Sequence, residues 1–285
     1  MKSSKEIAIV RILFFSLEYF LLARGNYFKL WAYVPSELWH PNGLMTFVED
    51  PKSIQALIPY IFMFWKFTLP LLVVGLAYRI VAPLNAVAGF ILINFAHSFG
   101  YQTHTFMPIV LGSLVLSFAP ANTVLSLDKF IFRKPSIFGE DRNKLGLFNL
   151  RLILCLVYFS AGLSKIINGG ISWINSDTLR NYFIMAYINY PDVNPTARQL
   201  SLNTLLYDYP IVCRILAVVV IMIEIAAPLA LLKGAWSVVI IFGLLCLQIS
   251  AYFTIFVNFQ AYLILYIAWV PIIYEYFKRR AQTRY

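Results

Sequence analysis

The sequence predicts an all-α protein, a polytopic transmembrane bundle of about eight helices. Of its 285 residues, 60% are hydrophobic and 13% are charged, and the mean hydropathy is +0.73. Soluble domains carry about 25% charged residues, so this composition is difficult to reconcile with a surface that faces water. Apolar runs long enough to cross a bilayer, which takes about 20 residues, also recur along the chain.

Eight apolar runs each predict one spanning helix. In chain order they are 7–24, 55–78, 80–98, 104–121, 149–167, 211–232, 236–256 and 260–277. The first has a basic start but no small-x-small cleavage site, and Arg11 and Glu18 interrupt it. We therefore expect an uncleaved helix instead of a signal peptide. No internal repeat and no soluble lumenal domain is evident, so we expect residues 1–285 to form a single domain.

The positions of the basic residues predict the orientation. If the N-terminus is inside, most of the 23 Lys and Arg residues fall in inner segments. Basic residues stay on the cytoplasmic side, so this bias predicts that both termini are inside. The polar loops 25–54 and 168–210 are then extracytoplasmic, and 122–148 is cytoplasmic. The two outer loops hold Trp, Tyr, Pro and Asn, which is typical of a folded cap at the membrane interface.

The net charge of +10 does not indicate nucleic-acid binding. The basic residues cluster at the ends of apolar runs, where they act as topology signals and contact lipid headgroups. Cys155, Cys213 and Cys246 are isolated in or beside apolar runs, and no Cys–Cys or Cys/His spacing indicates a metal site. We therefore predict membrane lipid as a partner, with no nucleic acid, disulfide or metal.

Ionisable groups at membrane depth cost about 2.5–3.5 kcal/mol on the insertion scale and usually face the bundle interior or a cavity. The candidates are Lys66, His97, His104, Lys165, Glu224 and, near boundaries, Arg79 and Arg214. The predicted topology puts His104, His97 and Lys165 level with one another at the outer side. Burial disfavours an ammonium ion, and histidine exchanges protons near neutral pH, so this level is a candidate reaction centre. Alternatively, the lysine extends to water and the histidines are polar caps.

Glu224 is predicted to lie about mid-helix in IMIEIAAPLALL. An intramembrane carboxylate indicates either function or a packing ion pair, for which Lys66 and Arg79 are possible partners. A binding or transport module with Lys66, Glu224 and Gln248 at the midplane is a further interpretation. The absence of a clear repeat or broken-helix pair disfavours it.

Several stretches together resemble one family, the horizontally transferred transmembrane domain (HTTM) proteins, which includes the membrane domain of vitamin K-dependent gamma-carboxylase. The resemblance spans nearly the whole chain. The stretches are YFSAGLSK at 158–165, GLAYRI at 75–80, QTHTFMP at 102–108, ANTVLSLD at 121–128 and WHPNGL at 39–44, with Arg11 and Glu224.

The resemblance implies a site and a chemistry. The carboxylase lysine that matches Lys165 deprotonates reduced vitamin K, which reacts with oxygen and leaves as the epoxide while a glutamate is carboxylated. The histidine that matches His104 is a second polar group of that site. By resemblance we expect Lys165 and His104 to be catalytic and a reduced quinone of the vitamin K or menaquinol type to be the cofactor. Expected pocket or supporting residues are Tyr158, Trp173, Asp128, Asn122, Arg79 and Glu224.

The sequence also departs from the carboxylase pattern. No counterpart of the large lumenal domain is evident, and Ser164 replaces the first of two lysines. The histidine that the family often has in its penultimate helix is not evident either, and Leu247, Gln248 and Ile249 occupy that area. Carboxylation of a protein through a propeptide is therefore not expected. The alternative function is maturation or export of a secreted peptide, with that peptide or a membrane protein bound by loops 25–54 and 168–210. In either case the resemblance implies a multi-pass protein of a prokaryotic cytoplasmic membrane.

Overall fold

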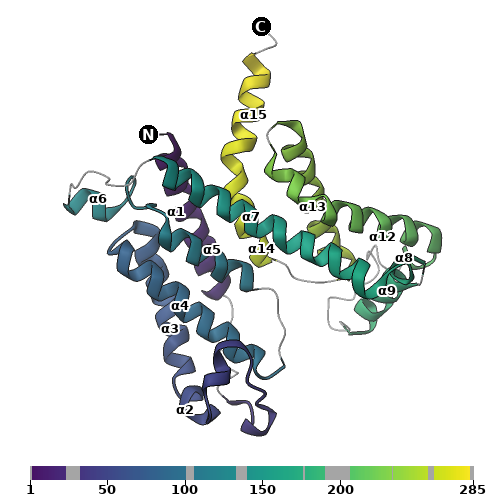
Figure 1. Cartoon of the computed structure of the whole chain (residues 1–285), viewed down its shortest axis with the longest axis horizontal. Helices are drawn as coiled ribbons and strands as arrows, with labels where there is room; N and C mark the ends of the chain where they lie inside the picture. The colour runs from purple at the N-terminus through teal and green to yellow at the C-terminus, as the bar shows by residue number, and fades with distance from the viewer. Residues whose placement is uncertain are drawn as a thin grey trace. The chain divides into compact units, whose positions relative to one another are not determined.

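The computed structural model describes most of the chain. The described residues are 2–23, 33–100, 106–132, 140–175, 177–189, 206–232, 234–255 and 260–282. Over these ranges the regular structure is helical and contains no strand (Figure 1). The all-α prediction is therefore confirmed.

The chain forms two compact units. Unit 1 is Met1–Ile153 with Gln260–Ile272, and unit 2 is Leu154–Phe259 with Ile273–Tyr285. The helix α7 (Glu140–Ser164) contributes to both. The expectation of a single domain stays a prediction.

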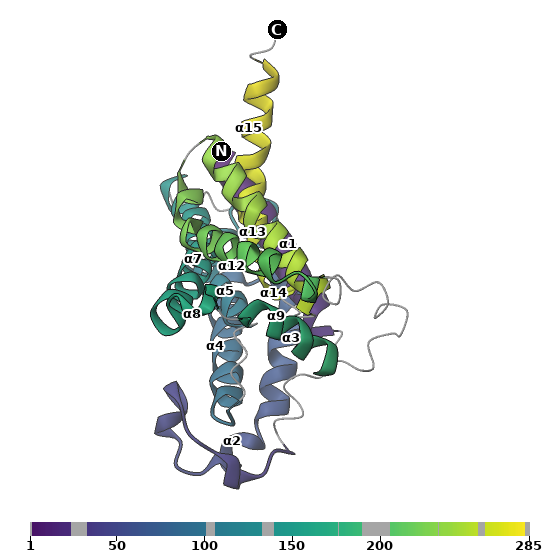
Figure 2. The same cartoon turned by 90° about the vertical axis from the view of Figure 1, so that its right-hand side faces the viewer.

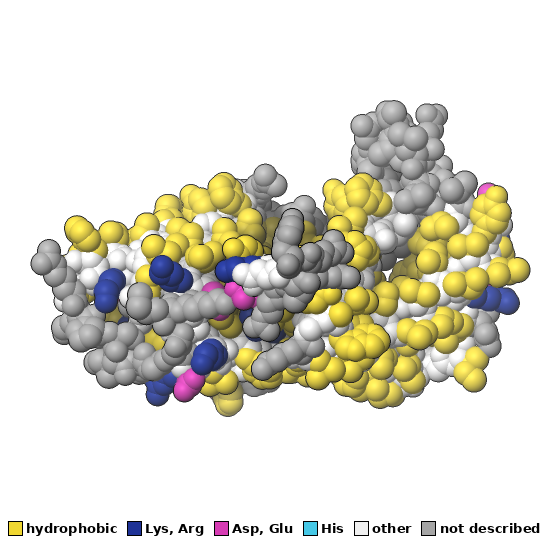
Figure 3. Space-filling view, turned by 90° about the horizontal axis from the view of Figure 1, so that it is seen from above, with side chains coloured by type: hydrophobic (Ala, Val, Ile, Leu, Met, Phe, Trp, Pro, Cys, Tyr) yellow, Lys and Arg dark blue, Asp and Glu magenta, His cyan; other side chains and the backbone are white. Residues whose placement is uncertain are grey.

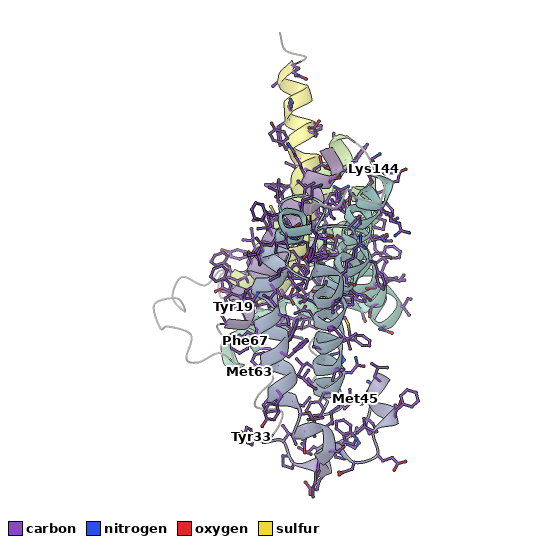
Figure 4. The ribbon with its side chains drawn as sticks, turned by 90° about the vertical axis from the view of Figure 1, so that its left-hand side faces the viewer. Tyr19, Tyr33, Met45, Met63, Phe67 and Lys144 are labelled. Atoms are coloured by element: carbon purple, nitrogen blue, oxygen red, sulfur yellow. The ribbon has the colours of Figure 1, made fainter. Side chains whose placement is uncertain are left out.

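Unit 1 is a bundle in which four helices pack side by side, each against the next. Its elements are α1 (Lys2–Ala23), α2 (Pro51–Gln55), α3 (Ile58–Val74), α4 (Tyr78–His97), α5 (Met107–Phe118), α6 (Leu127–Phe132), the start of α7, and α14 (Gln260–Tyr266). Helix α3 packs against α1 and α4, and α4 packs against α5 (Figures 1 and 2). Tyr33 and Met45 lie at one end of this unit and Lys144 at the other (Figure 4).

Unit 2 begins with the second half of α7. A π-helical segment (Lys165–Gly169) follows α7, and the other elements are α8 (Ser172–Asn175), α9 (Thr178–Asn189), α12 (Pro210–Ile225), a 3-10 helix (Ala227–Leu231), α13 (Ala235–Ile255) and most of α15 (Val270–Gln282). Helix α12 packs against α8, α9 and α13. The predicted outer loop 168–210 thus contains two short helices among its described residues.

Four helices among the described residues are long and apolar enough to cross a membrane. They are Pro51–Val74, Tyr78–His97, Asp141–Gly169 and Ala235–Thr254. They coincide with the predicted spans 55–78, 80–98, 149–167 and 236–256. The described parts of the other four predicted spans are also largely helical, and α5 is a shorter apolar helix. The count of eight and the orientation stay predictions.

Arg11 joins three distant parts of unit 1. Its side chain is fully buried, and Nη1 donates to the Ala121 carbonyl at 3.0 Å. Its Nη2 donates to the carbonyls of Val73, at 3.3 Å, and Leu125. The guanidinium carbon also lies 5.8 Å from the centroid of the Tyr78 ring. The α3–α4 turn and the segment after α5 are therefore held together by one side chain from α1.

Asp128 fixes the start of α4. Its carboxylate accepts the backbone N–H groups of Ala77 at 2.7 Å and Tyr78 at 3.0 Å, and the Asn122 amide at 2.9 Å. Its own N–H donates to the Gly75 carbonyl at 3.1 Å. The first N–H groups of a helix lack partners within it, and a carboxylate there also complements the helix dipole. Two of the family-like stretches, 75–80 and 121–128, therefore pack as one turn cluster.

We predict that Gly75→Ala destabilises the protein more than Gly100→Ala does. Both glycines have positive φ, +68° and +76°, so either alanine incurs backbone strain of about 1–2 kcal/mol. A Cβ at Gly75 would also lie 2.5 Å from Arg11 Nη1 and 2.6 Å from Ser126 Cβ, whereas a Cβ at Gly100 meets no atom within 4 Å. Thermal unfolding of the two variants in one detergent measures the difference, and equal losses would contradict a tightly packed turn cluster.

Candidate functional site

The helix that carries Lys165 changes its geometry at this residue. Residues Lys165–Gly169 form a π-helical turn, and Gly170, at φ +53°, ends it. A Cβ on Gly169 would lie 2.9 Å from Trp173 Cβ, so the glycine pair lets the chain turn back closely. Single π turns of this kind are frequent at functional sites. The local sequence thereby returns Trp173 to the region of the Lys165 amine.

Lys165 forms an ion pair with Glu224. Its Nζ lies 2.6 Å from both carboxylate oxygens. The exposed fraction of the side chain is 24% for Lys165 and 6% for Glu224. Nζ also lies 5.5 Å from the Trp173 ring centroid, within the range of a cation–π contact. The amine therefore contacts a buried carboxylate and an indole ring, and part of the Lys165 side chain stays exposed.

Glu224 does not lie mid-helix, which corrects the sequence-based placement. Helix α12 ends at Ile225, so Glu224 is in its last turn. A 3-10 helix begins at Ala227 with Pro228 in its first turn, and proline cannot continue an α-helix. A carboxylate at the negative end of a helix dipole is unfavourable unless a cation offsets it. Lys165 supplies this cation, so the partner differs from the expected Lys66 or Arg79.

A glycine permits the close approach of α7 and α12. A Cβ added at Gly162 would lie 2.8 Å from Glu224 Cβ and 3.2 Å from the Ile225 backbone nitrogen. Lys165 follows three residues later, at the start of the π-helical turn and on the same side of the helix. Any larger residue at 162 would therefore displace the end of α12 that carries the carboxylate.

Tyr158 extends the polar face of α7. It precedes Gly162 by four residues and Lys165 by seven, so all three lie on one side of the helix. The Tyr158 hydroxyl donates to Gln248 Oε1 of α13 at 2.6 Å, and both side chains are buried. Gln248 thus binds Tyr158 on the side of the helix that also carries Lys165.

The arrangement is suited to proton transfer. A carboxylate and an amine 2.6 Å apart can hold a proton on either group, and a third polar molecule near the exposed part of Lys165 can exchange it. The described residues contain no cluster of three or more His, Cys, Asp or Glu side chains that could hold a metal ion. The three cysteines are free, with Cys155 and Cys213 buried. Acid–base chemistry is what these side chains can supply.

The other predicted site residues lie elsewhere. Asp128 and Asn122 bind each other in the turn cluster of unit 1, and Arg79 is exposed in the first turn of α4. His97 is half-buried at the end of α4. His104 lies outside the described residues, so its proximity to Lys165 stays a prediction.

Two residues escaped the sequence reasoning. Glu18, noted only as an interruption of the first run, is fully buried and accepts a hydrogen bond from the Ser113 hydroxyl at 3.2 Å. A carboxylate inside an apolar run is the signal that could have identified it. Gly162 carries no such signal, because a glycine in a helix does not reveal what approaches it.

The family model for the HTTM domain matches residues 3–275. The chain belongs to the HTTM family. The match includes Lys165, Trp173 and Glu224 and nearly all of both units, so the chain is a membrane protein of this carboxylase-related family. No curated protein and no solved structure matches it.

We predict that Gly162→Ala destabilises unit 2 whereas Gly243→Ala does not. Both glycines are inside helices, where alanine alone gains about 0.5–1 kcal/mol. At Gly243 the new methyl group would meet Ile223 at an ordinary 3.7 Å. At Gly162 it would overlap Glu224, and overpacking costs about 1–3 kcal/mol. Thermal unfolding measures both, and a neutral or stabilising Gly162→Ala would show that α7 and α12 do not touch.

A double-mutant cycle on Lys165→Met and Glu224→Gln tests the ion pair. Removing one partner leaves the other charge poorly solvated, and contacting pairs couple by about 0.5–3 kcal/mol. We therefore expect the double variant to be clearly more stable than the sum of the single losses implies. The exposed pair Lys144–Asp141, with N–O at 3.3 Å and exposed fractions of 63% and 97%, is the control and should show little coupling. Equal coupling in the two cycles would argue against a buried pair.

Proposed function

We propose that this HTTM protein is a membrane enzyme that removes a proton from a lipid-soluble quinol or related hydroxyl compound. The observation that carries the proposal is the Lys165–Glu224 pair beneath Trp173 at the end of a candidate span. Its location at the outer face of a prokaryotic cytoplasmic membrane follows from the predicted orientation. The family resemblance supports the substrate class.

The pair supplies both functions that such a step needs. A phenolic hydroxyl has a pKa of about 10, so its deprotonation requires a base and stabilisation of the oxygen anion. When the phenolic O–H bond breaks, the proton passes to the amine–carboxylate pair. The cation that remains there stabilises the phenolate oxygen electrostatically. We therefore assign to Glu224 the role of controlling the protonation of the Lys165 amine.

Trp173 gives the site an apolar surface. Its ring lies over the Lys165 amine, which limits access of water and offers a flat face to a planar ring. In the related carboxylase the deprotonated quinol reacts with oxygen and becomes the epoxide. Quinone epoxide is therefore the product that we assign to this enzyme.

A second function is binding of a secreted peptide for its maturation. Residues 39–44 are docked onto the end of α4, where the His40 N–H donates to the Ser98 carbonyl at 2.7 Å and the Asn42 N–H to the Ser98 hydroxyl at 3.1 Å. On either side of this segment, Phe47 is 85% exposed and Tyr33 is 82% exposed. Exposed aromatic groups on a fixed scaffold are typical of partner-binding surfaces.

The test is a turnover assay of purified protein in nanodiscs with reduced vitamin K or menaquinol and oxygen. We expect epoxide, measured by mass spectrometry, from wild type and from Lys66→Ala, a control lysine on α3. Loss of an acid–base group typically reduces rates by about 10²–10⁴-fold, and we expect this of Lys165→Ala and a large loss from Glu224→Gln.

Epoxide from Lys165→Ala at the wild-type rate would refute the assigned role. No epoxide from wild type, together with crosslinks from a photoreactive group at Phe47 to a secreted peptide, would favour the maturation function instead.

A further inference from the structure

The short helix α6 exposes several large apolar side chains. Its six residues are Leu127–Phe132, and the exposed fractions are 40% for Leu127, 77% for Phe130 and 54% for Ile131. At about 100° per residue these three side chains share one side of the helix, which we name the α6 apolar face. Lys129 projects from the opposite side, beside Phe132, which is 60% exposed. The helix is therefore apolar on one side and mixed on the other, and nothing in the described part of the chain covers the α6 apolar face.

The position of α6 is fixed. Asp128 in its first turn binds the backbone of Gly75, Ala77 and Tyr78, and the Lys129 N–H donates to the Ser126 hydroxyl at 3.1 Å. The α6 apolar face is therefore held in place by hydrogen bonds that leave its side chains uncovered. The apolar side chains of α6 are thus exposed although the backbone of the helix is firmly held.

The anchor also sets the depth of α6 in the membrane. Tyr78, which Asp128 binds, is the first residue of the candidate span Tyr78–His97. The helix thus lies where a spanning helix passes from the headgroup region into hydrocarbon. An amphipathic helix at this level buries its apolar face about 5–10 Å into the boundary between headgroups and acyl chains.

Charge around α6 indicates which lipids it meets. Lys129 lies in the helix, and Arg133 and Lys134 follow directly in the sequence. Figure 3 shows Lys and Arg side chains, with some acidic side chains among them, on one part of the surface. Basic residues beside a membrane surface attract anionic lipid headgroups. The one acidic residue of the helix, Asp128, is turned inward to cap α4.

We propose that α6 is an interfacial anchor: its apolar face enters the acyl boundary of the leaflet at the α3–α4 turn, and Lys129 binds anionic phospholipid headgroups. A lipid surface is the occupant because the bilayer edge is already at this level and the charge is complementary. The anchor fixes the depth of the Arg11 turn cluster. It does not depend on the function proposed for Lys165.

The experiment uses the full chain in nanodiscs of phosphatidylcholine with phosphatidylglycerol. In a Cys246→Ser background, which removes the exposed native thiol, a fluorescent probe is attached to Phe130→Cys, Lys129→Cys or Asp141→Cys. Asp141, 97% exposed at the start of α7, is the water-facing control. We expect iodide to quench the probe at position 130 several-fold less than at 141. Lipids spin-labelled near the headgroup should quench position 130 strongly and position 129 less.

The lipid charge is tested at the same position. Spin-labelled phosphatidylglycerol should quench the probe at position 130 more than spin-labelled phosphatidylcholine, by up to about fivefold, because one basic residue near the surface is worth about that factor. Lys129→Gln should reduce this excess, while Arg133 and Lys134 remain.

Iodide quenching at position 130 equal to that at position 141 would overturn the proposal. The proposal would also be overturned if the probe at position 130 were protected from iodide but not quenched by spin-labelled lipid. Energy transfer between two labelled copies would then show that a second chain covers this face. Equal quenching by the two lipids would overturn the anionic preference.

Discussion

Lipid hydrocarbon offers no hydrogen-bond partner to a charged side chain, so each charge among spanning helices must be met by another part of the chain. Arg11 and Glu224 meet this constraint in different ways. Arg11 binds the carbonyl oxygens of Val73, Ala121 and Leu125, which lie at or beyond helix ends. Glu224 is met by the Lys165 amine. In both cases the partner is available because a helix stops or changes its geometry nearby.

The breaks in the helices are therefore as important as the helices. Carbonyl groups in the last turn of an α-helix lack a donor within the helix, so the end of α3 can accept from Arg11. The N–H groups at the start of α4 are met by Asp128, which ties α6 to the same turn. In unit 2, the stop of α12 before Pro228 and the π turn after Ser164 place a carboxylate and an amine together. The polar residues are positioned by irregular backbone.

This explains what the sequence could predict. Composition and run length suffice for the fold class, since apolar surface must meet lipid whatever the details of packing. The resemblance implies the importance of Lys165 but not its pairing with Glu224. The two residues are 59 positions apart, and the apolar run 211–232 predicts one continuous helix. Pro228 was the available signal that this helix ends early. Gly162 could not be recognised, because the closeness of α7 and α12 depends on tertiary packing that no local pattern records.

The π turn at Lys165–Gly169 also determines which changes in chain length the site tolerates. A π turn holds one more residue per turn than an α-helix, so a chain shorter by one residue in this segment could continue as regular α-helix without loss of backbone hydrogen bonds. Each residue removed, however, rotates everything that follows by about 100°. Trp173 would then leave the Lys165 amine while the fold survived. Deletion of one residue within 166–169 would thus keep the fold of the unit and remove the contact between Trp173 and the Lys165 amine. Active members of the family should therefore keep the spacing between the lysine and the tryptophan constant.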